Sequence, residues 1–264
     1  MAEPATALPL ADRVAIVTGA SGGIGRAVAL HLASLGARLI LVYSSNSARA
    51  DLLAAGFNSP SHTRAVTVQA DVSDPVSVRS LFDQAELAFS SPPHILVACA
   101  GFLDSKYPTL ADTTVEDWDK TFAVNVKGSF LCCREAANRL VRGGGGRIIT
   151  FSSSIAGTLL PSYSAYAASN AAVEAMTKIL AKELQGTGIT ANCIAPGPIK
   201  TDLFFAGKSE EFIERVIQKS SGRIGETEDV APVVGFLVQD EAHWVNGQVI
   251  RVNGQVIRVN GGFV

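Results

Sequence analysis

The sequence predicts a single α/β domain built on a doubly wound parallel sheet of about seven strands, with helices on both faces. Short runs rich in β-branched residues alternate with amphipathic stretches of helix length. A glycine-rich turn directly follows the first of these runs. The composition fits the same class, since 47% of the 264 residues are hydrophobic and 24 are glycine, which suits a buried sheet with tight turns. A chain of this length is commonly one domain in α/β proteins.

The strand runs and the helix stretches take turns along the chain. We expect strands over Arg13–Thr18, Arg38–Tyr43, Ala65–Ala70, Ile95–Ala98, Arg147–Phe151 and Thr190–Ile194. We expect helices over Ile24–Leu35, Ser47–Ala55, Pro75–Phe89, Val115–Leu140 and Tyr163–Leu184. Right-handed crossovers between parallel strands leave a ligand crevice at the carboxyl ends of the strands, where the strand order reverses.

The domain is expected to span residues 13–264, after an N-terminal extension over residues 1–12. The charged stretch Ala206–Gly222 lies between the sixth strand and the last helix, and it follows Phe204 and Phe205. This composition predicts an exposed helix, and we interpret residues 201–222 as a substrate lid. An ordinary surface insert is the alternative.

The C-terminus holds a tandem repeat over residues 247–260, because Gly247–Asn253 and Gly254–Asn260 both read GQVIRVN. A shift of seven residues turns the faces of a strand over, so the two copies cannot occupy one strand position equivalently. Asn253-Gly254 is a type I′ turn sequence between β-rich runs, which favours a hairpin that adds an edge strand. One copy in the sheet with the other looped out, or a cloning artefact, are the alternatives.

Charge, cysteine content and hydropathy exclude several classes. The net charge is −2, so no basic field indicates nucleic acid or an anionic membrane as partner. Every apolar run is far shorter than the ~20 residues of a membrane span. The four cysteines show no metal-ligand spacing and no disulfide framework, which is typical of a reducing compartment. The N-terminus shows no signal or transit peptide, so we expect a cytoplasmic protein.

The glycine-rich turn predicts a dinucleotide site. The buried run Val14–Val17 leads into TGASGGIG, and a helix follows. Glycines let the backbone approach a pyrophosphate, and the start of the helix offers unpaired N–H groups and a positive dipole end. The order strand, glycine turn, helix makes the fold Rossmann-like. The candidate phosphate-binding residues are Gly19, Ser21, Gly23, Ile24 and Gly25.

The end of the second strand indicates which dinucleotide is bound. An acidic residue there would hold the adenosine ribose and repel a 2′-phosphate. This strand instead ends in Tyr43, Ser44, Ser45 and Asn46, with Arg49 nearby and no carboxylate before Asp51. Hydroxyls, an amide and a cation suit a phosphate, so the sequence favours NADP(H) over NAD(H).

These motifs resemble the short-chain dehydrogenase/reductase family, and the resemblance covers almost the whole chain in order. It is carried by TGASGGIG at 18–25, Ala70-Asp71-Val72, Ala98-Cys99-Ala100-Gly101, FAVNVKG around Asn125, SSSIAG at 152–157, Tyr166, and Pro196-Gly197 followed by Thr201. The stretches AAVEAMTKILAKEL and ITANCIAPGPI are similar to plant NADPH-dependent aldehyde/ketone reductases.

The resemblance implies cofactor roles for residues outside the glycine turn. Asp71 and Val72 would frame the adenine, and Ala100 and Gly101 would line the cofactor floor. Pro196, Gly197, Ile199 and Thr201 would form the nicotinamide loop. Two positions depart from the family: Ala98 stands where asparagine is usual, and Gly22 stands where NADP-using relatives often have arginine.

The resemblance also implies a catalytic set. Tyr166 would donate a proton to the substrate carbonyl, Ser154 would orient that carbonyl, and Asn125 would hold a water of the proton relay. The SxxG spacing selects Ser154, with Ser152 and Ser153 as close competitors. Tyr163 is expected to line the substrate cleft or to pack as an ordinary aromatic.

Asn170 occupies the position where this family has a lysine, four residues after Tyr166. Residues four apart share a helix face, so Asn170 can still reach the cofactor ribose and we keep it in both the catalytic and the cofactor set. It carries no charge, however, and an ammonium there would lower the pKa of the tyrosine. The sequence therefore predicts a slow carbonyl reductase with NADP(H) as cofactor.

Two functions remain open, and a small carbonyl or alcohol is the expected substrate of the first. The alternative is a dinucleotide-binding scaffold without redox activity, acting as a cyclase, an isomerase or a binding protein. Leu203, Phe204, Phe205 and the loop Thr158–Ser162 predict an apolar cleft. The family resemblance further implies a dimer or tetramer built on the long helices and on the last strand and helix.

Overall fold

The computed structural model describes residues 7–219 and 223–254. Its centre is one sheet in which every neighbouring pair of strands is parallel, in the order β3-β2-β1-β4-β5-β6-β7. The strands are β1 (Val14–Thr18), β2 (Arg38–Tyr43), β3 (Ala65–Gln69), β4 (Ile95–Ala98), β5 (Arg147–Phe151), β6 (Thr190–Pro196) and β7 (Val249–Val252). The order reverses between β1 and β4, and the predicted seven-stranded doubly wound fold is confirmed.

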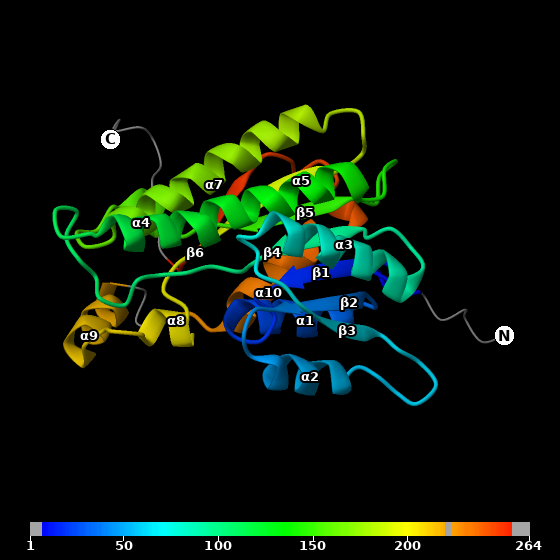
Figure 1. Ribbon diagram of the computed structural model, residues 1–264, viewed down its shortest axis with the longest axis horizontal. Helices are drawn as coiled ribbons and strands as arrows, with labels where there is room; N and C mark the ends of the chain where they lie inside the picture. Colours follow the sequence, from blue (N-terminus) through cyan, green and yellow to red (C-terminus); the bar gives the residue numbers. More distant parts are fainter. Residues whose placement is uncertain (1–6, 220–222, 255–264) are drawn as a thin grey trace.

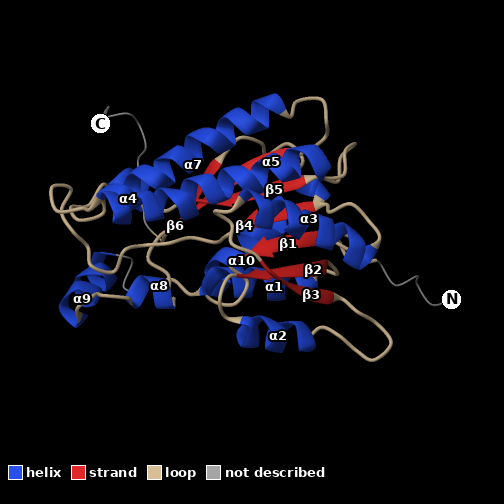
Figure 2. Cartoon of the chain, in the orientation of Figure 1, coloured by secondary structure: helices blue, strands red, loops and turns tan. Residues whose placement is uncertain are grey.

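Helices cover both faces of the sheet (Figures 1 and 2). One layer holds α1 (Gly23–Ser34), α2 (Ser47–Ala55) and α10 (Thr227–Leu237), whose buried side chains share one core cluster. The other holds α3 (Pro75–Phe89), α5 (Ser129–Arg139) and α7 (Ser164–Glu183), which share a second cluster. No helix among the described residues is both long and apolar enough to cross a membrane.

The first strand shows how the sequence divides the two cores. Val14 and Ile16 belong to one cluster and Ala15 and Val17 to the other, and all four are fully buried. Side chains alternate across a strand, so an unbroken apolar run supplies both faces at once.

The expected helix over Val115–Leu140 is divided in the structure. It consists of α4 (Val115–Phe122), a π-helical turn η1 (Ala123–Gly128) and α5. The predicted extent is nearly right, but the prediction of one continuous α-helix is wrong. A π-turn widens the backbone by one residue and is frequent at functional sites. Here it contains Asn125, one of the predicted site residues.

The predicted lid forms two short helices, α8 (Asp202–Phe205) and α9 (Glu210–Lys219). Both lie at one end of the molecule, apart from the helical layers of the sheet (Figure 1). The remaining short elements are α6 (Ile155–Thr158), which follows β5, and the 3-10 turn η2 (Asp240–Ala242).

The N-terminal extension and the C-terminal repeat are both partly described by the structure. Leu10 of the N-terminal extension is fully buried, and its N–H donates to Leu35 O at 2.9 Å.

The first repeat copy supplies β7, which pairs with β6 through Cys193–Pro196. Gly254 has a φ of +61°, a left-handed conformation that a turn often needs. The second copy lies outside the described residues, and so does the hairpin proposed for it.

Candidate functional site

A cavity of about 740 Å³ opens at the carboxyl ends of the strands. Its walls contain every site residue expected from the sequence. These are Gly19, Ser21, Gly23, Ile24, Gly25, Tyr43, Ser44, Ser45, Asn46, Asp71, Val72, Ala100, Gly101, Asn125, Ser154, Tyr166, Asn170, Pro196, Gly197, Ile199 and Thr201. The fold therefore gathers segments far apart in sequence into one crevice, as a doubly wound sheet does.

The glycine turn is shaped for a close backbone approach. Gly19 has a φ of +68°, and a Cβ on Gly25 would lie 2.4 Å from the Gly19 carbonyl oxygen. Only glycine fits at Gly25, so α1 begins directly against the turn. The first turn of α1 carries no acidic side chain that would compete with a phosphate for its N–H groups.

Thr18 fastens this turn to the next strand of the crevice. Its hydroxyl oxygen accepts hydrogen bonds from the N–H groups of Cys99 and Ala100, each at 3.0 Å. Thr18 is 1% exposed, so this junction between β1 and β4 is buried. The junction holds the cofactor floor in place where family members usually have an asparagine and this chain has Ala98.

Arg49 lies at the adenosine end of the cavity. Its N–H donates to Asn46 Oδ1 at 3.1 Å, which caps α2 and sets the start of that helix. The guanidinium pairs with Asp202 of the lid at 3.1 Å, on the exposed surface. A Cβ added to Gly22 would lie 3.7 Å from Arg49 Nη1. The Arg49 guanidinium thus reaches the position where relatives often have arginine.

Tyr166 lies near the start of α7 and lines the cavity. Burial raises the pKa of its phenol, and hydrogen bonds with the Ser153 and Asn170 side chains oppose that rise. Neutral partners stabilise a phenolate less than an ammonium does. The phenol is therefore held protonated at neutral pH, as a proton donor must be.

Ser152, Ser153 and Ser154 all line the cavity with Tyr166, and SxxG spacing selects Ser154 among them. Of these three, Ser153 is the one whose side chain lowers the pKa of the Tyr166 phenol. Ser154 stands at the N-cap position of α6 without a side-chain capping hydrogen bond, and its N–H donates to Pro196 O at 2.8 Å.

Asn170 is 5% exposed, and its amide turns back along its own helix. Its Nδ2 donates to the backbone carbonyl of Tyr166 at 2.8 Å. The amide therefore stays beside Tyr166, as the four-residue spacing predicted, and brings no charge to the cavity.

Asn125 secures the loop that follows β4. Its Oδ1 accepts from Phe102 N–H at 2.7 Å, and its Nδ2 donates to Phe102 O at 2.9 Å and to Ser169 Oγ at 3.1 Å. Asn125 is 6% exposed. Its amide therefore joins the π-turn, α7 and the cavity wall, a structural task that the motif match did not predict.

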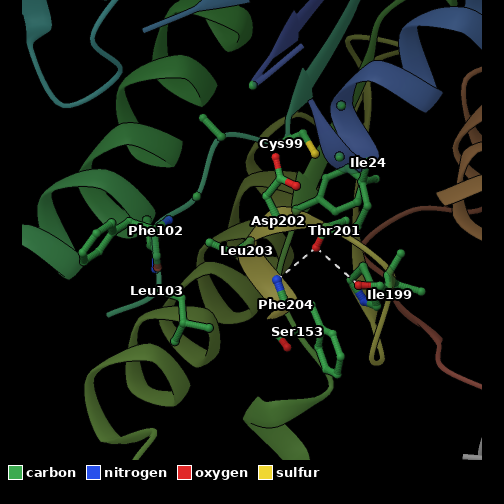
Figure 3. A pocket seen from close by; sticks show the side chains of 18 of the residues that line it. Ile24, Cys99, Phe102, Leu103, Ser153, Ile199, Thr201, Asp202, Leu203 and Phe204 are labelled. Atoms are coloured by element: carbon green, nitrogen blue, oxygen red, sulfur yellow. Dashed lines mark hydrogen bonds between the residues drawn. The ribbon is translucent and has the colours of Figure 1, made fainter. Parts of the chain in front are cut away.

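The substrate side of the cavity is largely apolar and aromatic. Figure 3 shows Cys99, Phe102 and Leu103 opposite the segment Ile199–Phe204. The Thr201 hydroxyl donates to Ile199 O at 3.3 Å and accepts from Phe204 N–H at 3.1 Å, which starts α8. Tyr163, expected to line the cleft, does so.

Sequence reasoning missed several lining residues. Phe102, Leu103, Phe212, Val216 and Lys208 carry no motif, and the last three sit within a stretch recognisable only as a charged lid. The amphipathic spacing of Phe212 and Val216, four residues apart, is the signal that could have found them. Within residues 7–219 and 223–254, no three His, Cys, Asp or Glu side chains are grouped to hold a metal ion.

An open doubly wound sheet, a glycine turn, and a half-buried tyrosine in one cavity with three serines define the class of a dinucleotide-dependent oxidoreductase. A family model described as enoyl-(acyl carrier protein) reductase matches residues 19–256. With its similarity to curated members, this match shows that the chain belongs to the short-chain dehydrogenase/reductase family.

Two Arabidopsis thaliana proteins are similar over nearly the whole chain. An NADPH-dependent aldehyde reductase-like protein, chloroplastic, is 59% identical over 92% of this chain and 93% of its own. NADPH-dependent aldehyde reductase 2, chloroplastic, is 53% identical over the same shares. A short-chain dehydrogenase from Burkholderia cenocepacia, solved in complex with NADP, has a TM-score of 0.85 at 35% identity, covering 93% of this chain and 98% of that one.

These relatives test two expectations. The predicted preference for NADP(H) is confirmed at the level of the relatives, which are named NADPH-dependent or were solved with NADP. The expected cytoplasmic location is wrong, because both Arabidopsis relatives are named chloroplastic. That expectation rested on the N-terminal composition, which was not sufficient to predict the compartment.

Proposed function

We propose that the protein reduces an aldehyde or ketone carbonyl with NADPH, or oxidises the corresponding alcohol with NADP⁺. The observation that carries the proposal is that Tyr166 and Ser153 line the same cavity as the glycine turn. The turn can approach a pyrophosphate closely because the glycines that line the cavity carry no side chains. When bound, NADPH supplies the hydride.

The protein's own residues supply the proton and the orientation. The Ser153 hydroxyl holds the carbonyl oxygen, and the Tyr166 phenol donates its proton to that oxygen as charge develops there. Burial raises the pKa of Tyr166, which keeps the phenol protonated at neutral pH. Asn170 stabilises the resulting phenolate less than a lysine would, so we expect the reaction to be slow.

The adenosine end selects the cofactor through Arg49. The guanidinium lies between Gly22 and Asp202 and is exposed, so it can turn from the Asp202 carboxylate to a 2′-phosphate. A guanidinium binds phosphate oxygens through paired N–H groups. This arrangement supports NADPH, in agreement with the names of the Arabidopsis relatives.

A second candidate function rests on Asn170. Without a cation beside Tyr166, the cavity could polarise a carbonyl and leave redox chemistry unused, as a cyclase or isomerase would. The same side chains, Ser153 and Tyr166, would then serve a non-redox reaction. We rank it second because the glycine turn and the nicotinamide loop are intact.

The test is a titration with NADPH and with NADH, combined with turnover of a panel of aldehydes and ketones. We expect NADPH to bind more tightly than NADH and the reduced-cofactor absorbance to fall in step with product. Tyr166→Phe is the control, and it should abolish turnover while cofactor binding remains. Product without loss of reduced cofactor would establish the second candidate instead.

A further inference from the structure

Lys208 is a cation in the cavity wall that the proposed chemistry does not use. It lines the cavity together with Phe204 of α8 and Phe212 of α9. Its Nζ donates to the Tyr107 hydroxyl at 2.5 Å and to Phe204 O at 2.6 Å. The ammonium also lies 4.7 Å from the ring centroids of Tyr107 and Phe204 and 5.9 Å from that of Tyr163.

The backbone is built to aim Lys208 inward. The preceding Gly207 has a φ of +69°, and a Cβ there would lie 2.0 Å from Ser105 O. The lid thus presses against the loop that carries Tyr107, whose hydroxyl donates to Ala206 O at 2.9 Å. The position of the ammonium therefore follows from tight contact between the lid and this loop.

The ammonium has hydrogen-bond acceptors but no counter-charge in the described part of the chain. No Asp or Glu oxygen of residues 7–219 and 223–254 forms an ion pair with it, whereas Arg49, the other cation of the cavity wall, pairs with Asp202. Burial lowers the pKa of Lys208 to about 8, so it remains largely charged at neutral pH. A partly desolvated ammonium with a third N–H gains most from an anion.

Tyr163 connects this ammonium to the reacting centre. Its ring centroid lies 5.1 Å from that of Tyr107, and its side chain lines the same cavity as Tyr166, three residues on. A carbonyl compound held at Tyr166 and Ser153 would therefore extend past the Tyr163 ring toward Lys208.

We propose that Lys208 binds a carboxylate on the substrate, so that the enzyme prefers oxo-acids with a remote carboxylate to neutral carbonyl compounds. This proposal rests on the carbonyl reduction proposed above. The aromatic rings around Lys208 suit the methylene chain of such a substrate, and the third N–H of the ammonium meets its terminal anion. Lys208 is then a specificity-determining residue supplied by the lid.

A purely structural role is the competing explanation. Lys208 joins the lid to Tyr107, and losing that clamp would slow turnover of every substrate alike. The two roles differ in one measurable ratio, the kcat/KM for an acid divided by the kcat/KM for its neutral ester.

The experiment compares 4-oxobutanoate and 6-oxohexanoate with their methyl esters as substrates of wild type, Lys208→Met and Lys208→Arg, with NADPH. We expect wild type to favour at least one acid over its ester, mainly through KM, and Lys208→Met to reduce that ratio about tenfold or more. Lys208→Arg keeps the charge and should retain most of the preference. Lys106→Met is the control, because Lys106 is exposed, pairs with Asp117 and lies outside the cavity wall.

An unchanged acid-to-ester ratio in Lys208→Met, or a wild type without preference for either acid, would overturn the proposal. A separate measurement covers failure of the proposed reaction. Calorimetric binding of adipate to the NADP⁺-loaded protein needs no turnover, and we expect about tenfold weaker binding in Lys208→Met. If no carbonyl is reduced but adipate binding still depends on Lys208, the reductase proposal fails and the carboxylate site stands. Adipate binding equal in both proteins overturns the site whatever the reaction.

Discussion

In the proposed reaction, Asn170 limits proton transfer because its side chain carries no charge. Its amide is buried and donates to the Tyr166 backbone carbonyl, so an uncharged group fills the place beside the phenol. We expect Asn170→Lys to raise kcat at neutral pH by at least about tenfold, because an ammonium stabilises the phenolate. Steady-state kinetics with a neutral aldehyde would measure this. Asn170→Gln is the uncharged control, and an equal gain in that variant would refute an electrostatic cause.

The raised pKa of Tyr166 fixes the direction of the pH dependence. Reduction needs the protonated phenol, so its kcat/KM should stay level through neutral pH and fall only at alkaline pH. Alcohol oxidation needs the phenolate, so its rate should rise throughout that range. Asn170→Lys should move both profiles toward lower pH, since it lowers the pKa of the phenol. Profiles that coincide in the two proteins would contradict this account.

Ser153 and Ser154 offer a matched pair of variants on the same turn. Because the Ser153 side chain lowers the pKa of the phenol and Ser154 occupies the N-cap position of α6, we expect Ser153→Ala to lower kcat about a hundredfold. Ser154→Ala should change kcat by much less. A larger loss of kcat in Ser154→Ala than in Ser153→Ala would instead assign the carbonyl-orienting role to Ser154, the serine that SxxG spacing selected.

At the scale of elements, the contact between the lid and the Tyr107 loop depends on Gly207. Its φ of +69° and the 2.0 Å approach of a Cβ to Ser105 O leave no room for alanine. We expect Gly207→Ala to displace the lid and raise substrate KM several-fold, with the midpoint of thermal unfolding little changed because the lid lies outside both cores. Gly186→Ala is the control, since Gly186 also has a positive φ but nothing lies within 4 Å of its Cβ position. An equal rise in KM for both variants would show that the close contact with Ser105 O is not the cause.

The elements also show what the sequence could and could not predict. Strands with unbroken apolar runs, such as Arg38–Tyr43, were placed with the correct bounds because burial on both faces dictates their composition. The π-turn at Asn125 escaped prediction, since one extra residue in a helical turn leaves no trace in the hydrophobic pattern. The proposed role of Lys208 could not be predicted for a related reason. A lysine in a charged segment is expected to be solvated, and only tertiary packing brings it over three aromatic rings.

At the scale of the whole molecule, a cluster of charges joins distant parts of the chain at the end of the sheet opposite the cavity. Arg147, at the start of β5, is 1% exposed, and its Nη2 lies 3.1 Å from Asp240 Oδ1. The other carboxylate oxygen of Asp240 lies 2.6 Å from Arg13 Nη2. Arg147 also donates to the carbonyl oxygens of Gly144 and Gly146, each at 2.8 Å. Asp240 therefore supplies the counter-charge that lets a buried guanidinium lie between the first strand and the last helices.

Removing that counter-charge should destabilise the fold. Breaking a buried ion pair costs about 3–5 kcal/mol, but Asp240 is largely exposed and Arg147 keeps its carbonyl acceptors, so we expect Asp240→Asn to lose about 1–3 kcal/mol of unfolding free energy. Urea unfolding at neutral pH measures the loss, with Glu241→Gln as the control for the same change in net charge on the neighbouring residue.

At acid pH, wild type and Asp240→Asn should have the same unfolding free energy. The hydrogen bond from Arg13 holds the pKa of Asp240 below its ordinary value, so the carboxylate stabilises the fold fully above that ordinary value. Its contribution is lost as pH falls through the lowered folded-state pKa, because Asp240 of the wild type then becomes neutral, as the asparagine of the variant already is. The unfolding free energies of the two proteins should therefore converge at acid pH and stay apart at neutral pH. A gap that is constant across this range would mean that the loss comes from packing around Asp240, and not from its charge.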